Sequence, residues 1–408
     1  MKPIIHWISR PLVCLAFLPL ASLGQAQDSS FQVQASEVHL GDGTHLKNGV
    51  LLVRDGKILS VAPGESLDPA LPLIKHEGVL TAGMVACQSM GGTLAGADDR
   101  TRNVLPEARV ADAVLRDHSD FERALAAGIT TVVLVPSAAN LAGGITTVVK
   151  TAGGKPLKRE GHLAISFSSK ALGRTRPRPR FFFGSVEDGS PENTNGSQSG
   201  DRLPTSYAGA KRMLAELIAD NSNAESAFAR VARGELPVLL EAWDRNEVVR
   251  AAQFVSEFGL SGVLRGAPLG GDPTVTRALK QSGLGVIVGP FGLGQVTRSL
   301  ESAASMAKAG IPLAFALGAP ANDPSSFRLS AVLTASAGAD PEDMLNSLTS
   351  VAAKLAGVEE RVGSIKPGMD ADFVLWSAHP LNLASSVQAV YVDGKLAWRQ
   401  NNKDEQSR

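Results

Sequence analysis

Histidine is the side chain that most often binds a metal or moves a proton at neutral pH, and it occurs seven times in the 408 residues. No two histidines stand at His-x-His or His-x-x-x-His spacing, the patterns that bring two imidazoles to one metal. Four of them fall in or near the β segments expected at the two ends of the chain. His162 starts a predicted strand and so lies at its wrong end for catalysis. These spacings predict no metal centre. The six histidines beyond the N-terminal 26 residues are His39, His45, His76, His118, His162 and His379.

Motifs for nucleophilic catalysis and phosphate binding are also missing. The chain has no Gly-x-Ser-x-Gly elbow, and "AGGKPLK" lacks the spacing of a phosphate-binding loop. Cys87 lies in an apolar run without a neighbouring histidine, so a buried, inert thiol is expected rather than a nucleophile.

Polar residues follow two successive apolar runs in the middle of the chain. Glu241 ends "LPVLLEAW", and Arg265 ends "LSGVLRG". If these runs are neighbouring parallel strands, the two charges meet at one edge, where an ion pair is the simplest arrangement. A remodelled catalytic site is the alternative.

Strand and helix patterns alternate through the middle of the chain, which indicates an α/β fold with a parallel sheet. The number of repeats favours a closed (β/α)₈ TIM-like barrel over a doubly wound sheet, for which no Gly-x-Gly-x-x-Gly motif follows the first strand. The strands are expected within residues 81–90, 128–136, 162–168, 236–243, 260–266, 284–291 and 311–320.

Both ends of the chain carry β-hairpin patterns. "GVLLVRDGKILSV" turns at Asp55-Gly56, and "VQAVYVDGKLAW" turns at Asp393-Gly394. We therefore expect a small β-sandwich domain built from residues 27–80 and 364–408, with the barrel formed by residues 81–363.

The N-terminus has the pattern of a cleavable secretion signal: Lys2 and Arg10, an apolar stretch, then small residues up to Ala26. Cleavage near Ala26 predicts a secreted or periplasmic protein. Lys+Arg and Asp+Glu are equal at 40 each, so no basic excess indicates binding to nucleic acid or to a membrane surface.

One segment interrupts the α/β pattern. Arginines alternate with other residues from Arg174 to Arg180, and a Gly/Ser/Asn/Pro-rich tract follows. Such a composition buries little apolar surface, so residues 184–200 are expected to form a flexible loop. The arginines could bind an anion, although a solvated arm is the simpler interpretation.

The stretch "VGSIKPGMDADFVLWSAHPL" is similar to the C-terminal signature of the amidohydrolase superfamily, G-x-(I/L)-x-P-G-x-x-A-D. "ALAAGITTV" and "NLAGGITTVVKTAG" also look like this family, and "RLPTSYAGAKRMLAELI" resembles its imidazolonepropionase-like branch. The resemblance implies a barrel enzyme in which zinc or another divalent metal activates water at the carboxyl ends of the strands.

The positions that match the family's metal site hold other residue types. The two first-strand histidines correspond to Gln88 and Met90, and the fifth-strand pair corresponds to Glu241 and Trp243. The sixth-strand histidine falls at Arg265. The last-strand aspartate falls at Pro320, which has no proton acceptor in its side chain. Lys170 is the nearest match for the bridging lysine. From these differences, we expect a degenerate member without a metal or other cofactor.

Two functions follow from the sequence. One is an exported, catalytically inactive pseudo-enzyme that binds a small molecule or serves as partner subunit to an active paralogue, as a homo- or hetero-oligomer. The other is a divergent hydrolase of carbon–nitrogen (non-peptide) bonds with a site that the alignment does not reveal.

Overall fold

The computed structural model describes residues 30–93, 96–99, 101–168, 171–172, 204–220, 222–266 and 269–401. The predicted secretion signal, the predicted flexible loop at 184–200 and Lys170 lie outside the described residues. Among the helices that the structure describes, none is both long and apolar enough to cross a membrane.

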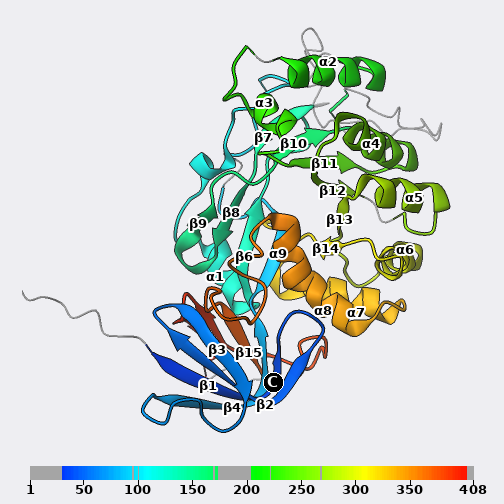
Figure 1. Cartoon of the computed structure of the whole chain (residues 1–408). Helices are drawn as coiled ribbons and strands as arrows, with labels where there is room; N and C mark the ends of the chain where they lie inside the picture. Colours follow the sequence, from blue (N-terminus) through cyan, green and yellow to red (C-terminus); the bar gives the residue numbers. More distant parts are fainter. Residues whose placement is uncertain are drawn as a thin grey trace, which may run out of the picture.

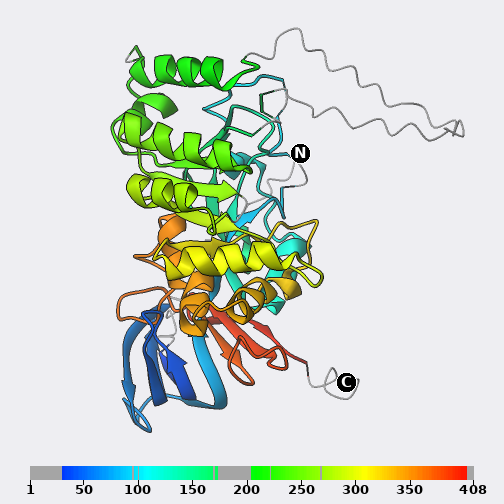
Figure 2. The ribbon, with the colours of Figure 1, turned by 90° about the vertical axis from the view of Figure 1, so that its right-hand side faces the viewer.

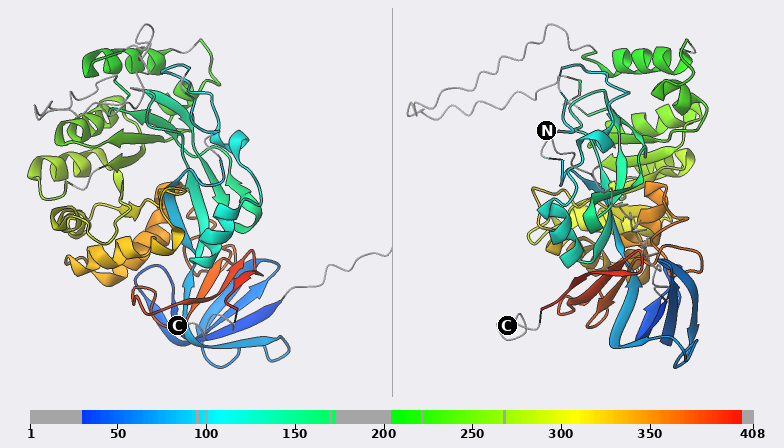
Figure 3. Two further views of the ribbon diagram at one scale, coloured as in Figure 1. Left: turned by 180° about the vertical axis from the view of Figure 1, so that it is seen from behind. Right: turned by 90° about the vertical axis from the view of Figure 1, so that its left-hand side faces the viewer.

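Strands from both ends of the chain form one seven-stranded sheet, in the order β17-β16-β15-β4-β1-β2-β3. The blue N-terminal strands and the red C-terminal strands lie together at one end of the molecule in every view (Figures 1 and 3). Its strands are β1 (Phe31–His39), β2 (His45–Arg54), β3 (Lys57–Pro63), β4 (Leu73–Ala82), β15 (Phe373–Trp376), β16 (Val387–Val392) and β17 (Lys395–Arg399).

Both predicted hairpins of this terminal sheet are confirmed. β2 pairs antiparallel with β3, and β16 pairs antiparallel with β17. Asp55 and Asp393 have a φ of 50°, and the glycines after them have a φ of 77° and 68°. Positive φ at both central residues is the requirement of a type I′ turn, which explains the Asp-Gly pairs.

The remaining strands build the barrel region as two sheets, in the orders β14-β13-β12-β11-β10-β7 and β5-β6-β8-β9, and most of their neighbours are parallel. β5 pairs with β6, and β10 to β14 follow one another in parallel order. These strands are β5 (Met84–Ser89), β6 (Ile129–Leu134), β7 (Ala142–Ile145), β8 (Thr147–Lys150), β9 (Lys155–Lys158), β10 (Leu163–Ser166), β11 (Val238–Ala242), β12 (Gly262–Gly266), β13 (Gly285–Val288) and β14 (Leu313–Phe315).

The α/β barrel fold expected from the sequence is confirmed, but its third position differs from a regular (β/α)₈ pattern. β7 and β8 are separated only by Thr146; β7 pairs antiparallel with β10, and β8 pairs antiparallel with β6. On the other side, the backbone N–H of Leu317, just after β14, donates to the carbonyl of Gln88 in β5 at 2.9 Å.

Alternate side chains of the barrel strands meet in one buried cluster. β5, β6, β11, β12 and β13 contribute Val85, Val133, Leu239, Val263 and Ile287, and α9 packs against the same cluster. Side chains therefore fill this part of the barrel interior, as they do in other barrels of this class.

Helices cover the outside of the barrel and stack along one side of the molecule in Figure 2. The longest, α4, begins with a capping box between Asp244 and Glu247 and ends at Gly259, which has a φ of 63°. The helices are α1 (Ser119–Ala126), α2 (Tyr207–Ala219), α3 (Ala227–Ala232), α4 (Arg245–Phe258), α5 (Pro273–Ser282), α6 (Thr297–Lys308), α7 (Leu329–Ser336), α8 (Pro341–Leu348) and α9 (Ser350–Ala356), with short 3₁₀ turns η1 (Val110–Ala113), η2 (Ala152–Gly154) and η3 (Pro324–Ser326).

Candidate functional site

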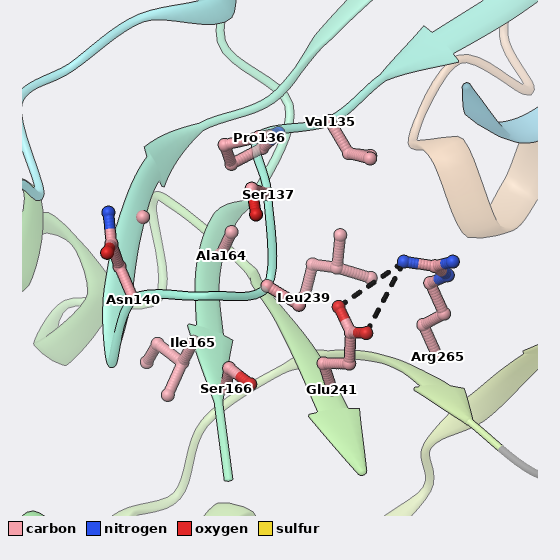
Figure 4. Close-up of a pocket in the computed structure, with 12 residues that line it drawn as sticks. Val135, Pro136, Ser137, Asn140, Ala164, Ile165, Ser166, Leu239, Glu241 and Arg265 are labelled. Atoms are coloured by element: carbon pink, nitrogen blue, oxygen red, sulfur yellow. Dashed lines mark hydrogen bonds and ion pairs between the residues drawn. The ribbon is translucent and has the colours of Figure 1, made fainter. Parts of the chain in front are cut away.

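Two charged side chains meet at the carboxyl ends of β11 and β12. The parallel register places Glu241 directly beside Arg265. Arg265 Nη1 lies 3.4 Å from Glu241 Oε1 and 3.3 Å from Oε2, as the dashed lines in Figure 4 show. Both side chains are mostly buried, with exposed fractions of 12% for Glu241 and 19% for Arg265. The ion pair expected from the sequence is therefore present.

Trp243 covers this ion pair from the first residues after β11. Its Nε1–H donates to Glu241 Oε1 at 2.8 Å, and the Arg265 guanidinium lies 5.3 Å from the centre of its ring. The backbone N–H of Trp243 donates to Glu247 Oε2 at 2.8 Å, so the capping box of α4 holds the residue in place. The Glu241 carboxylate is thus hydrogen-bonded from two sides, beneath an aromatic ring that remains 41% exposed.

Glu241 and Arg265 line a small, tight pocket of about 10 Å³, shown in Figure 4. Its walls come from the chain after β6 and from β10, β11 and β12, with Ser137 and Ser166 as polar lining residues. Arg265 Nε is buried and has no hydrogen-bond partner among the described residues. A buried donor of this kind is satisfied best by an acceptor atom, from water or from a ligand.

The other three predicted site positions meet where β5 approaches the chain after β14. Gln88 is buried, and its main-chain oxygen accepts the N–H groups of Leu317 and Gly318. The Met90 N–H donates to the oxygen of Ala319 at 2.8 Å, next to Pro320. Gln88 Oε1 has no hydrogen-bond partner in the part of the chain that the structure describes. The six positions therefore divide into two groups, one around Gln88 and one around Glu241.

Comparisons with known proteins agree with this architecture. Residues 276–397 match the amidohydrolase family. An amidohydrolase from Thermotoga maritima MSB8 has a similar structure over 91% of this chain and 100% of its own, with a TM-score of 0.75 and 24% identity. Residues 276–397 are thus similar to the amidohydrolase family, and the chain as a whole shares the fold of the Thermotoga protein.

Two further similar proteins are informative. A 62-residue stretch is 47% identical to an imidazolonepropionase of Shewanella loihica (strain ATCC BAA-1088 / PV-4), over 14% of this chain and 15% of the relative. The match therefore spans a small part of that enzyme. The structure of molinate hydrolase is similar over 90% of this chain and 94% of its own, with a TM-score of 0.58 and 15% identity.

The residues at the strand ends do not fit the divalent metal that we expect in an amidohydrolase. Glu241 is the single carboxylate among the six matched positions, and it faces the permanent positive charge of Arg265. A dication beside Glu241 would be repelled by that guanidinium. The thioether of Met90 is a soft ligand, and Pro320 offers no side-chain donor at all. The six matched residues at the carboxyl ends of the barrel strands therefore do not form a site for a divalent metal.

The expectation that the chain has no metal ligands is nevertheless wrong. The structure brings His39, Glu342 and His379 together, with one ligand atom of each within 4.8 Å of the others. Imidazole nitrogen and carboxylate oxygen are the ligands that zinc prefers after thiolate. The spacing rules missed this group because its members come from β1, α8 and the loop after β15, far apart in the sequence.

Other polar residues have structural roles. Asp323, three residues after Pro320, accepts from the Ser325 N–H and caps η3. Complete burial raises the pKa of Cys87 to about 12, so its thiol is inert. Burial and the nearby Lys158 lower the pKa of His162 to about 4, so this imidazole stays neutral.

A buried charge network between the barrel and the terminal sheet was not predicted. Lys150 of β8 is 4% exposed and forms ion pairs with Asp370 at 2.7 Å, with Asp372 at 3.1 Å and with Asp393. Lys57 and Arg361 also pair with Asp370, at 2.5 and 2.6 Å.

The two buried carboxylates of this network differ in pKa. Burial, only partly opposed by Lys150, raises the pKa of Asp372 to about 6. Burial acts on Asp370 in the same direction, but hydrogen bonds from its three cationic neighbours lower the pKa of Asp370 to about 2. Asp370 and Asp372 are the two aspartates of "DAD" in the C-terminal signature, and their cationic partners lie far away in the sequence.

Proposed function

We propose that this amidohydrolase-superfamily protein is exported and binds a small ligand at the mouth of its barrel without hydrolysing it, alone or as partner subunit to an active relative. The observation that carries the proposal is the hydrogen bonding of the Glu241 carboxylate. Its carboxylate already accepts hydrogen bonds from Arg265 and from Trp243.

A hydrolase needs a group that takes a proton from water, with a pKa near the working pH and a free lone pair. The Glu241 oxygens that could take this proton already accept hydrogen bonds from the Arg265 guanidinium and the Trp243 indole. Pro320, at the position of the family's proton-shuttling aspartate, cannot take a proton. This combination favours binding over hydrolysis.

The pocket suggests what kind of ligand binds. Its volume of about 10 Å³ admits a group no larger than about one water molecule, and its charged wall presents the buried Arg265 Nε as a free donor. A single carboxylate or carbonyl oxygen of a small molecule would satisfy that donor, while the rest of the molecule stays at the opening of the pocket.

Activity and binding can be tested on the same sample. The purified mature protein is mixed with imidazolonepropionate, with and without added Zn²⁺ or Mn²⁺, and loss of the substrate is followed. Small carboxylates are titrated in parallel by the fluorescence of Trp243, with Trp243→Phe as the control that lacks the reporter. We expect saturable quenching and no turnover. Turnover that disappears in Glu241→Gln would refute the proposal, because Glu241 would then serve in catalysis.

A divergent hydrolase of carbon–nitrogen bonds is the second candidate, and the group of His39, Glu342 and His379 favours it. Two histidines and one carboxylate form the ligand set of several zinc hydrolases. In that case turnover would disappear in His379→Ala and persist in Glu241→Gln, a pattern that separates the two functions.

Export is tested separately. The full-length chain is expressed in a Gram-negative host and the periplasmic fraction is collected. We expect the protein there, with a mass that corresponds to cleavage near Ala26. A protein that stays in the cytoplasmic fraction and still carries residues 1–26 would contradict export.

A further inference from the structure

Five titratable side chains gather where the terminal sheet meets the start of α8. Glu37 and His39 lie on β1, and His45, the register partner of His39, begins β2. Glu342 lies in the first turn of α8, and His379 follows β15. None of them lines the pocket at the barrel mouth, so this group is separate from the ligand site proposed there.

His39 is the centre of this group. Its side chain is 5% exposed, and its Nδ1 lies 3.4 Å from Glu342 Oε2. His379 Nε2 lies 3.7 Å from the other oxygen of the same carboxylate. The rings of His39 and His379 are 5.1 Å apart, edge to face. Two imidazoles thus converge on one carboxylate from different segments of the chain.

These distances are close to those around a bound zinc ion. Zinc–ligand bonds of about 2.0–2.1 Å in a tetrahedral site place neighbouring ligand atoms about 3.3 Å apart. The pair formed by His39 and Glu342 already meets this spacing, and the pair formed by His379 and Glu342 exceeds it by a few tenths of an ångström. These two distances run to different oxygens of Glu342, and the three ligand atoms lie within 4.8 Å of one another, so rotations of the partly exposed Glu342 and His379 side chains have to close the site.

We propose that His39 Nδ1, His379 Nε2 and a Glu342 carboxylate oxygen bind one zinc-like divalent cation. The fourth position is open to solvent, because His379 is 32% and Glu342 is 37% exposed. The cation joins β1, α8 and the loop after β15, so it fastens the terminal sheet to the barrel helices.

The second nitrogen of His39 supports this assignment. Nε2 is buried and has no hydrogen bond among the described residues, although Glu37 Oε1 lies 3.3 Å away. A histidine that binds a metal through one nitrogen usually donates the other N–H to a carboxylate. Binding through Nδ1 would place the proton on Nε2, and a small rotation would then direct it to Glu37. Glu37 Oε1 is also 3.8 Å from His45 Nε2, which makes His45 an outer neighbour rather than a ligand.

The simplest competing explanation is a set of histidine–glutamate ion pairs without a metal. Both explanations predict that loss of His379 or Glu342 affects stability, so stability alone does not separate them. The two explanations are separated by direct binding of Zn²⁺ and by how strongly each variant weakens that binding.

The test uses the mature protein, stripped with EDTA, exchanged into metal-free buffer and titrated with zinc chloride by calorimetry. We expect one equivalent to bind. Outer-sphere partners contribute about 10–100-fold in metal affinity, so Glu37→Gln should weaken binding within that range. The ligand variants His379→Ala and Glu342→Gln should weaken it by at least about 100-fold. His118→Asn is the matched control: His118 caps α1 away from the group, and asparagine keeps a capping acceptor.

Thermal unfolding provides a second measurement. Zn²⁺ should raise the Tm of the wild-type protein and of His118→Asn, and leave the Tm of His379→Ala unchanged. Wild-type protein that binds no equivalent, or unchanged affinity in His379→Ala and Glu342→Gln, would overturn the proposal. Glu241→Gln should bind Zn²⁺ like wild type, so failure here is distinct from failure of the proposed binding function.

Discussion

Replacing Lys150 by methionine tests whether the buried charge network fastens the terminal sheet to the barrel. Methionine keeps most of the length of the side chain and removes only the charge. Asp372 then stays fully buried, with one oxygen accepting the Asp393 N–H and the other without a partner among the described residues. Asp370 keeps Lys57 and Arg361. Removing one partner of a buried ion pair costs about 3–5 kcal/mol, and we expect a loss in this range at pH 8.

The dependence on pH follows from the raised pKa of Asp372. Its pKa is about 6 in the folded protein, against an ordinary value of 3.8 for an aspartate, so the folded state binds more protons between these two pH values. The stability from this group is fully present below pH 3.8 and is lost as the pH rises through 6. Two pKa units correspond to about 3 kcal/mol. Lys150 lowers the pKa of Asp372. Without Lys150, the loss of stability with rising pH should therefore extend to higher pH. Lys150→Met should therefore be less damaging at pH 5 than at pH 8.

The assay is urea unfolding of the mature protein at pH 5 and pH 8, followed by circular dichroism. Lys150→Met combined with Asp372→Asn is the control, because the neutral amide no longer needs a cation. It should recover part of the loss at pH 8. An equal loss at both pH values, or a loss below about 1 kcal/mol, would refute the view that burial of Asp372 controls this network.

Three further predictions concern the barrel. Glu241→Ala should lower the free energy of unfolding by about 1–3 kcal/mol because Arg265 loses its partner, and Glu241→Gln should cost less; equal losses in urea unfolding would contradict this. Cys87 should react with a thiol reagent at pH 8 only after unfolding, since its pKa is about 12; fast labelling of the native protein would be inconsistent with its burial. Gly262→Ala should lower the Tm, because a Cβ there would lie 2.1 Å from a carbonyl oxygen of β11, whereas Gly271→Ala meets nothing within 4 Å and should leave the Tm unchanged.

The sequence predicted the features that depend on local patterns. Six of the expected barrel segments contain the parallel strands β6 and β10 to β14, and the segment from Thr81 to Met90 contains β5. Turn chemistry identified both hairpins, because Asp-Gly is favoured where two successive residues need positive φ. The ion pair between Glu241 and Arg265 was also predictable, since the two residues end successive apolar runs and the carboxyl ends of neighbouring parallel strands lie at one edge of a sheet.

Features that depend on distant pairing could not be predicted in this way. The apolar run around Thr146 gives no sign of its direction, so the antiparallel path of β7 and β8 was missed. The group around His39 was missed because Glu342 lies 303 residues away in the sequence, beyond any spacing rule. Metal ligands from separate segments can be found only when the fold is known.

The buried network also explains how a chain can keep the family's signature and lack its strand-end ligands. Asp370 and Asp372 belong to the C-terminal signature, and their partners, Lys150 of β8 and Lys57 of β3, come from the barrel and the terminal sheet. These aspartates therefore connect the barrel to the terminal sheet. Loss of the family's histidines at the barrel mouth leaves these ion pairs intact, whereas replacing Asp372 leaves the buried Lys150 with one partner fewer. The C-terminal signature thus stabilises the fold, whereas any activity depends on other residues: Glu241, Arg265 and the group around His39.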